Sequence, residues 1–141
     1  MSVKRALEFN FKVRLNEVFE GTKYAVTESA RLERRELPCI IINAQDSVAF
    51  EEHPEVQNNF DVNVEILVLS NIDETTIDEH LTAVDKCLDK MQEKDVRTKS
   101  RIRYLYLYGT YFVNTIEEYE ERKIGTSITY KVHCNYGALE S

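Results

Sequence analysis

The chain has 141 residues, of which 43% are hydrophobic and 30% charged, a composition typical of a soluble globular domain. It excludes wholesale disorder, a collagen-like chain and a disulfide scaffold, and no run approaches the roughly 20 apolar residues of a membrane span. The formal net charge is -7, so phosphate backbones repel the chain unless its basic residues gather on one face. With two prolines, four glycines and no linker-like stretch, we expect one domain over residues 1–141.

The three cysteines, Cys39, Cys87 and Cys134, all lie in apolar stretches. Their odd number and the absence of a CxxC spacing predict free thiols that serve as small core residues in a reducing compartment. The N-terminus MSVKRALEF has no apolar stretch before a small-residue cleavage site, so we expect no signal peptide.

The first segment, residues 2–20, fits two patterns. One set of apolar residues recurs at spacings typical of one helical face: Val3, Leu7, Phe11, Leu15 and Val18. Another set alternates as in a strand: Leu7, Phe9, Phe11, Val13 and Leu15. The length of the segment favours a helix, and Gly21 stands where a glycine commonly ends one.

Two short strands and a loop are expected next. Residues 22–29 (TKYAVTES) and 36–43 (ELPCIIIN) predict strands, and the connection between them contains a cluster of arginines. From Ala44 to Asn59 the chain is polar and carries the run Glu51-Glu52-His53, which predicts an exposed loop.

A central strand and a central helix follow. In residues 60–69 (FDVNVEILVL) the apolar positions alternate, and Leu67 and Leu69 make the second face apolar at one end. Thr76 and Glu79 form a capping-box pattern ahead of a helix. Its predicted apolar stripe, with Leu81 and Val84 at the centre and Cys87 at the edge, contains Ile77, Leu81, Val84, Leu88 and Met91. The predicted solvent face contains Asp78, Asp85, Lys86 and Asp89.

The C-terminal third predicts strands. Residues 101–113 (RIRYLYLYGTYFV) alternate, with Gly109 at an expected bulge or bend, and a charged hairpin is expected near residues 120–125. Residues 128–136 (ITYKVHCNY) place alternate apolar side chains on one face. The order of elements predicts an α+β fold: a mostly antiparallel mixed β-sheet with an N-terminal helix and a central helix packed against it.

Motifs for catalysis, metals and cofactors are missing from the sequence. Neither phosphate-binding glycine pattern nor the nucleophile elbow GxSxG occurs, so we expect no enzyme activity and no cofactor. His133 and Cys134 are adjacent, but neighbours on a strand point to opposite faces and do not easily share one ion. His53 and His80 have no partners at ligand spacing, so no metal site is predicted.

Two charged stretches are the candidate functional residues. The basic residues Arg97, Lys99, Arg101 and Arg103 alternate and precede Tyr104, Tyr106 and Tyr108. Such a pattern suits single-stranded nucleic acid, or a strand that enters the sheet from a charged loop. The acidic residues Glu117, Glu118, Glu120 and Glu121 predict a solvated hairpin face.

Features suited to protein contact are more abundant than features of any chemistry. The chain has eight tyrosines, predicted strand edges, and long charged connections at 44–59 and 114–127. The residues therefore favour an interaction or structural protein.

The layout resembles that of the tail terminator proteins of long-tailed bacteriophages, also called tail completion or tail-to-head joining proteins. The resemblance is one of pattern along most of the chain. It includes the amphipathic N-terminal segment, the strand Pro38-Cys39-Ile40-Ile41-Ile42 and the strand at residues 59–66 (NFDVNVEI). The helix 77–91, the charged hairpins and the closing residues 128–132 (ITYKV) complete it.

This resemblance implies a non-enzymatic ring, commonly a hexamer, that caps the tail tube and halts its polymerisation. The partners would be further copies of the chain, the tail tube protein and a neck or connector protein, with no membrane. Genome DNA would pass through the lumen without specific binding, since an acidic lumen repels it. The location would be the virion tail or neck, assembled in host cytoplasm.

Two alternatives remain beside the tail terminator. One is another phage neck or head–tail connector component, which also forms rings. The other is a small nucleic-acid-binding module that uses residues 97–108. For a ring, the acidic hairpin and the basic stretch are expected to meet near subunit boundaries, or one of them faces the lumen and the other a neighbour.

Overall fold

The computed structural model describes residues 3–28, 37–45, 48–49, 59–71, 77–92, 97–99, 103–120 and 123–138. The helices are α1 (Val3–Val18) and α2 (Ile77–Gln92). The strands are β1 (Ala25–Glu28), β2 (Cys39–Ala44), β3 (Val48–Ala49), β4 (Asn59–Asn71), β5 (Arg97–Lys99), β6 (Arg103–Glu120) and β7 (Lys123–Ala138). The predicted α+β class, with an N-terminal and a central helix against a sheet, is confirmed.

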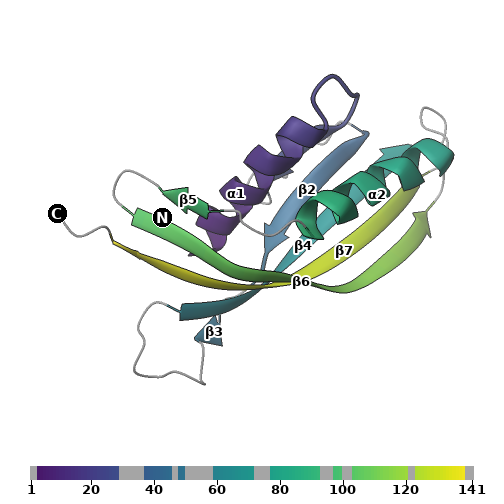
Figure 1. Ribbon diagram of the computed structural model, residues 1–141. Coiled ribbons are helices and arrows are strands. Elements are labelled where there is room, and N and C mark those ends of the chain that lie inside the picture. The colour runs from purple at the N-terminus through teal and green to yellow at the C-terminus, as the bar shows by residue number, and fades with distance from the viewer. Residues whose placement is uncertain are drawn as a thin grey trace.

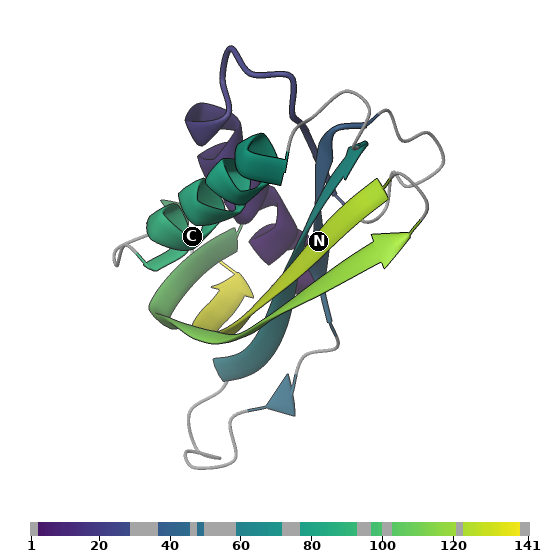
Figure 2. The same ribbon diagram turned by 90° about the vertical axis from the view of Figure 1, so that its right-hand side faces the viewer.

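The described strands form one sheet in the order β1-β2-β4-β7-β6-β5, and β3 pairs with the beginning of β4. Only the β1–β2 pair is parallel, so the sheet is mixed but mostly antiparallel, as predicted. Both helices lie on the same face of the sheet, with α1 beside β1 and β2 and α2 nearer β4 and β6 (Figures 1 and 2). The sheet thus has one face covered by helices and one that neither helix covers.

Helix α1 settles the ambiguity of the first segment in favour of the helix. Leu7, Phe11 and Leu15 are buried, whereas Phe9 and Val13, which belonged to the strand pattern, are exposed. The helix ends before Gly21, whose φ of 78° lies in the left-handed region that glycine adopts without strain. In this segment, the pattern that repeats every 3.6 residues therefore determines the structure, and the two-residue alternation does not.

Helix α2 is present where it was predicted, but its buried stripe is rotated. His80, Ala83, Val84, Cys87 and Met91 are buried. The prediction that Leu81 lies at the buried centre is wrong, because Leu81 and Ile77 are exposed. Cys87 is fully buried rather than at the edge. The predicted solvent face, at Asp78, Asp85, Lys86 and Asp89, is exposed as expected.

The core lies between the helices and the inward faces of the central strands. Alternate residues of β4 and β7 are fully buried there, including Val64, Ile66, Ile128 and Tyr130. The Tyr130 hydroxyl donates a hydrogen bond to the carbonyl of Leu88 in α2, at 3.3 Å. This bond satisfies a polar group that would otherwise be buried without a partner.

The bounds of several strands differ from those predicted. Strand β1 begins only at Ala25, and β2 begins at Cys39. The expected loop 44–59 is wrong at its ends: Ala44 is buried in β2, and Asn59 begins β4. It is also wrong at β3, which pairs with Asp61 and Phe60 of β4. The rest of that loop and Thr76 of the capping box lie outside the described residues.

Strands β6 and β7 form a long, curved hairpin (Figure 1). Their pairing continues to Glu120 and Lys123, so the hairpin turn falls within the predicted range. The register shifts between Leu107 and Gly109, which confirms the predicted irregularity, and again between Phe112 and Asn114. The two shifts bend the outer part of β6, which we call the β6 arm and define as residues 107–120.

Candidate functional site

The charged stretches predicted as candidate sites are far apart within one chain. Arg97 and Lys99 belong to β5, which pairs with the beginning of β6, where Arg103 is the first residue. Glu117, Glu118 and Glu120 lie at the other end of β6. Fourteen positions separate Arg103 from Glu117, roughly 45 Å of strand at ~3.3 Å per residue. Arg101 and Glu121 lie outside the described residues.

The β6 arm has an open edge. Among the described strands, β5 pairs with β6 only at residues 104–106, so from Leu107 onward β6 pairs with β7 alone. Large apolar side chains are exposed along it: Tyr111, Phe112, Val113, Ile116 and Tyr119. An open strand edge that carries apolar side chains is typical of a surface that another chain covers. The β6 arm is therefore the main candidate interface.

The register assigns the side chains of the β6 arm to two faces. Ile116 pairs with Ser127 and Glu118 with Gly125, on the face that the helices do not cover. Glu117 pairs with Thr126, which is buried on the helix face. Glu117 and Glu118 therefore lie on opposite faces of the sheet, although they are neighbours in sequence and are both exposed.

A cavity of about 530 Å³ lies on the uncovered face beside the β6 arm. Leu67, Leu69 and Ile116 give it apolar walls, and Glu65, Glu118 and Lys123 add charge. Ser127 donates a 2.7 Å hydrogen bond to the Glu65 carboxylate. Gly125 contributes no side chain, and a Cβ there would come within 3.0 Å of Leu69. The cavity thus combines apolar walls with charged side chains of both signs.

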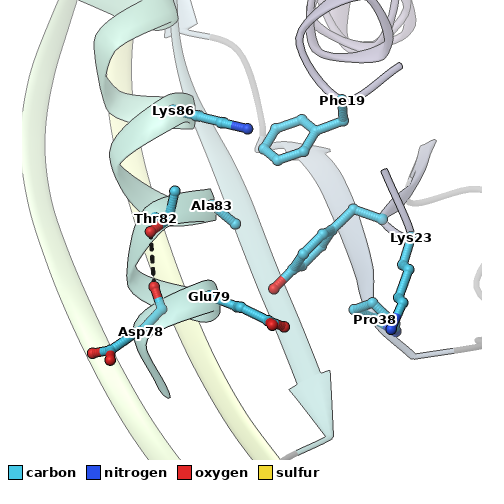
Figure 3. A pocket seen from close by; sticks show the side chains of 9 residues that line it. Phe19, Lys23, Pro38, Asp78, Glu79, Thr82, Ala83 and Lys86 are labelled. Carbon is cyan, nitrogen blue, oxygen red and sulfur yellow. Dashed lines mark hydrogen bonds between the residues drawn. The ribbon is translucent and has the colours of Figure 1, made fainter. Parts of the chain in front are cut away.

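A second cavity, of about 420 Å³, lies between the end of α1 and the first turns of α2 (Figure 3). Phe19 and Pro38 line one side, and Ala83 and Thr82 line the other (Figure 3). Its charged lining residues are of both signs: Lys23, Asp78, Glu79 and Lys86. Thr82 donates a 2.8 Å hydrogen bond to the carbonyl of Asp78, which is part of the helix itself. This cavity contains no arrangement that selects one chemistry.

Four polar side chains, one of which also lines the second cavity, form a continuous hydrogen-bonded network. The hydroxyls of Tyr24 and Ser70 are 2.9 Å apart, Ser70 bonds Nδ1 of His80 at 2.8 Å, and Nε2 of His80 bonds Thr126 at 2.8 Å. His80, Ser70 and Thr126 are fully buried. Burial lowers the pKa of His80, and the charge of Glu117 opposes that shift.

This hydrogen-bonded network was not predicted from the sequence, because the spacing of residues gave His80 no partner. Its members come from the segment before β1, from β4, from α2 and from β7. A neutral imidazole donates from one nitrogen and accepts at the other, so it links two hydroxyls in the core. This network joins α2 to the sheet, and its partly buried member Tyr24 also lines the second cavity.

The cysteines agree with the sequence analysis, and His133 and Cys134 lie on opposite faces, as expected for neighbours on a strand. All three cysteines are free and buried. Burial raises the pKa of the Cys87 and Cys134 thiols to about 12, so both stay protonated near neutral pH. His133 contacts the carboxylate of Asp61 on the uncovered face, whereas Cys134 lies on the core face. Among the described residues, no three potential metal ligands come together.

Neither helix of the described chain has the length and apolarity required to cross a bilayer.

Comparison with solved structures gives an informative likeness, whereas the sequence searches give none. No protein-family model and no curated protein matches the sequence. Among solved structures, the chain is similar to a chain described as "Virion of native gene transfer agent (GTA) particle". That similarity has a TM-score of 0.60 and 11% sequence identity, and it covers 94% of this chain and 92% of that chain. At this identity, the likeness establishes a shared fold.

Proposed function

We propose that this protein is a non-enzymatic structural component of a phage-like virion, specifically a tail terminator. It forms a ring, commonly a hexamer, that caps the tail tube and joins it to the head or neck. The observation that carries this proposal is the shared fold, over nearly the full length of both chains, with a chain of a gene transfer agent virion. The pattern of elements that resembles tail terminators supports it independently.

The β6 arm supports the assembly part of the proposal. A monomer with a long open strand edge and five exposed large apolar residues along it is prone to aggregation unless a partner covers them. A ring repeats one head-to-tail contact, so it requires two unlike surfaces on each subunit. The net charge of -7 is compatible with a lumen through which DNA slides without being bound.

Sedimentation of the purified protein, followed by electron microscopy with purified tail tubes, tests this proposal. The expected result is a ring in solution, its concentration-dependent equilibrium with monomer, and rings attached to one end of the tubes. A ring that binds a neck protein but ignores tail tubes indicates a connector component instead. A stable monomer that retains single-stranded oligonucleotide indicates the nucleic-acid-binding module and rejects the ring.

A further inference from the structure

The exposed face of helix α1 is the second unusual surface of this chain. Phe9 and Val13 are 50% and 44% exposed, and they lie four residues apart on one face of the helix. Arg5 is exposed one turn before Phe9, and Lys12 lies beside Val13. A surface helix of a monomer usually presents polar side chains at such positions. We call this surface the α1 stripe and define it as Arg5, Phe9, Lys12 and Val13.

The α1 stripe carries two basic side chains, Arg5 and Lys12, of which Lys12 forms a 3.2 Å ion pair with Glu28 of β1. The helix contains Lys4, Arg5, Lys12 and Arg14 against Glu8 and Glu17. Glu8 does not act at the surface, because its side chain is buried and accepts a 3.0 Å hydrogen bond from the backbone N–H of Ala44. Arg5 is therefore the exposed cation of the α1 stripe, since Lys12 is only partly exposed.

The cavity beside the β6 arm is complementary to this stripe. It has apolar walls at Leu67, Leu69 and Ile116, and two carboxylates, Glu65 and Glu118, against one amine, Lys123. The two surfaces also belong to different parts of the molecule. Helix α1 covers β1 and β2 at one side of the sheet, whereas β6 lies at the other side and the cavity is on the uncovered face.

We infer that the α1 stripe of one copy docks into the cavity beside the β6 arm of the next copy. Phe9 enters between Leu67, Leu69 and Ile116, and Arg5 lies against Glu118. This inference rests on the proposed ring and specifies its subunit contact. The contact is heterologous, because the two surfaces are unlike and opposite in charge, and repeating it continues around a ring. Pairing of two β6 edges, by contrast, joins two copies through the same surface and stops at a dimer.

Substitutions at both surfaces test the contact. Phe9→Glu and Ile116→Glu are each expected to weaken assembly roughly tenfold or more, because a buried apolar anchor is replaced by a charge. Leu81→Glu is the matched control, since Leu81 is a similarly exposed apolar residue on α2, outside the contact. Analytical ultracentrifugation measures assembly, and circular dichroism checks that each variant is folded.

A charge exchange tests which residues meet. Arg5→Glu and Glu118→Arg are each expected to weaken the ring, and the double variant is expected to restore part of the loss. Paired cysteines give a direct readout: the chain with both Phe9→Cys and Ile116→Cys should form disulfide-linked ladders on oxidation. Each single variant is then expected to form none, because the native cysteines are buried.

The outcomes separate this inference from the proposed function. If the wild-type chain forms rings that Phe9→Glu and Leu81→Glu affect equally little, the contact is wrong and the ring stands. A dimer that Ile116→Glu abolishes but Phe9→Glu leaves intact indicates β6 edge pairing and overturns the contact. A wild-type chain that stays monomeric at all concentrations, with or without tail tubes, rejects both.

Discussion

His80 lies fully buried between α2 and the sheet, where it links Ser70 to Thr126. The sequence contained a signal for this hydrogen-bonded network. Ser70 continues the series of alternate, buried residues that runs from Val62 to Val68. Thr126 likewise continues that of Ile128 and Tyr130. Polar residues in phase with a buried face require partners. Their partner on a separate helix was not predictable from spacing alone, since it depends on how α2 lies on the sheet.

Burial of His80 predicts a pH dependence of stability. Its pKa in the folded protein is lower than the ordinary value of 6.5, so the unfolded chain binds the proton more tightly. The stabilisation is complete above that ordinary value and is lost as pH falls below it toward the lowered pKa. Thermal unfolding from pH 7.5 to 5 should therefore show a smaller loss of stability for His80→Gln than for the wild type. His53 and His133 are unchanged in both chains, and parallel curves would contradict the role of His80.

Leu81 and Met91 test the phase of helix α2. Met91 is 2% exposed and Leu81 is 39% exposed, although both were predicted on the same buried stripe. Met91→Ala should reduce the free energy of unfolding by roughly 2–5 kcal/mol, because it leaves a cavity in the core. Leu81→Ala should change it by less than about 1 kcal/mol. Denaturant titration measures the free energy of unfolding of both variants. Equal losses would indicate that Leu81 is buried as the sequence predicted.

At the scale of elements, the error in α2 has a physical cause. The sequence prediction gave weight to the most hydrophobic residues, Ile77 and Leu81, whereas the helix buries His80 and Ala83. A small residue allows close approach to the sheet, and a hydrogen-bonded histidine is acceptable in the core. The strands were predicted more accurately because alternation has only two phases. The short β3 and the cavity beside the β6 arm depend on pairing between distant segments. The periodicity of hydrophobic residues gives no information about such pairing.

One buried carboxylate adds a hydrogen bond to the apolar packing between α1 and β2. Glu8 is buried and accepts a hydrogen bond from the N–H of Ala44 at the end of β2. Glu8→Ala leaves that buried N–H without this partner and should lower the free energy of unfolding by about 1–3 kcal/mol. Glu8→Gln retains an acceptor oxygen and should lose less. Denaturant titration compares the two, and equal stabilities would show that the bond contributes nothing.

At the scale of the whole molecule, the charge distribution predicts weak interaction with DNA. The net charge is -7, and Glu117, Glu118 and Glu120 lie together near the hairpin end. The free protein should therefore not retain duplex or single-stranded DNA at physiological salt. Fluorescence anisotropy with labelled DNA checks this. Submicromolar binding that weakens steeply with added salt would instead favour the basic residues Arg97, Lys99, Arg101 and Arg103 as a nucleic-acid site.

The acidic end of the hairpin should act in assembly rather than in folding. Glu117 and Glu118 are exposed, and individual rim charges contribute little to stability. Replacing Glu117, Glu118, Glu120 and Glu121 by lysine should therefore weaken ring formation or tail joining while the circular dichroism spectrum stays unchanged. Four exposed acidic residues of α2, namely Asp78, Glu79, Asp85 and Asp89, allow a control with the same change in net charge.

The comparison between these two variants separates a local contact from a general effect of charge. Lysine substitutions in the hairpin oppose Arg5 of the neighbouring copy in the inferred contact, whereas those on α2 alter only the overall field. Sedimentation should show weakened rings for the hairpin variant and intact rings for the α2 variant. Equal weakening would indicate net charge as the cause. Intact rings and undiminished joining in the hairpin variant would remove these glutamates from the interface and from the lumen, because a reversed lumen charge would retard DNA passage.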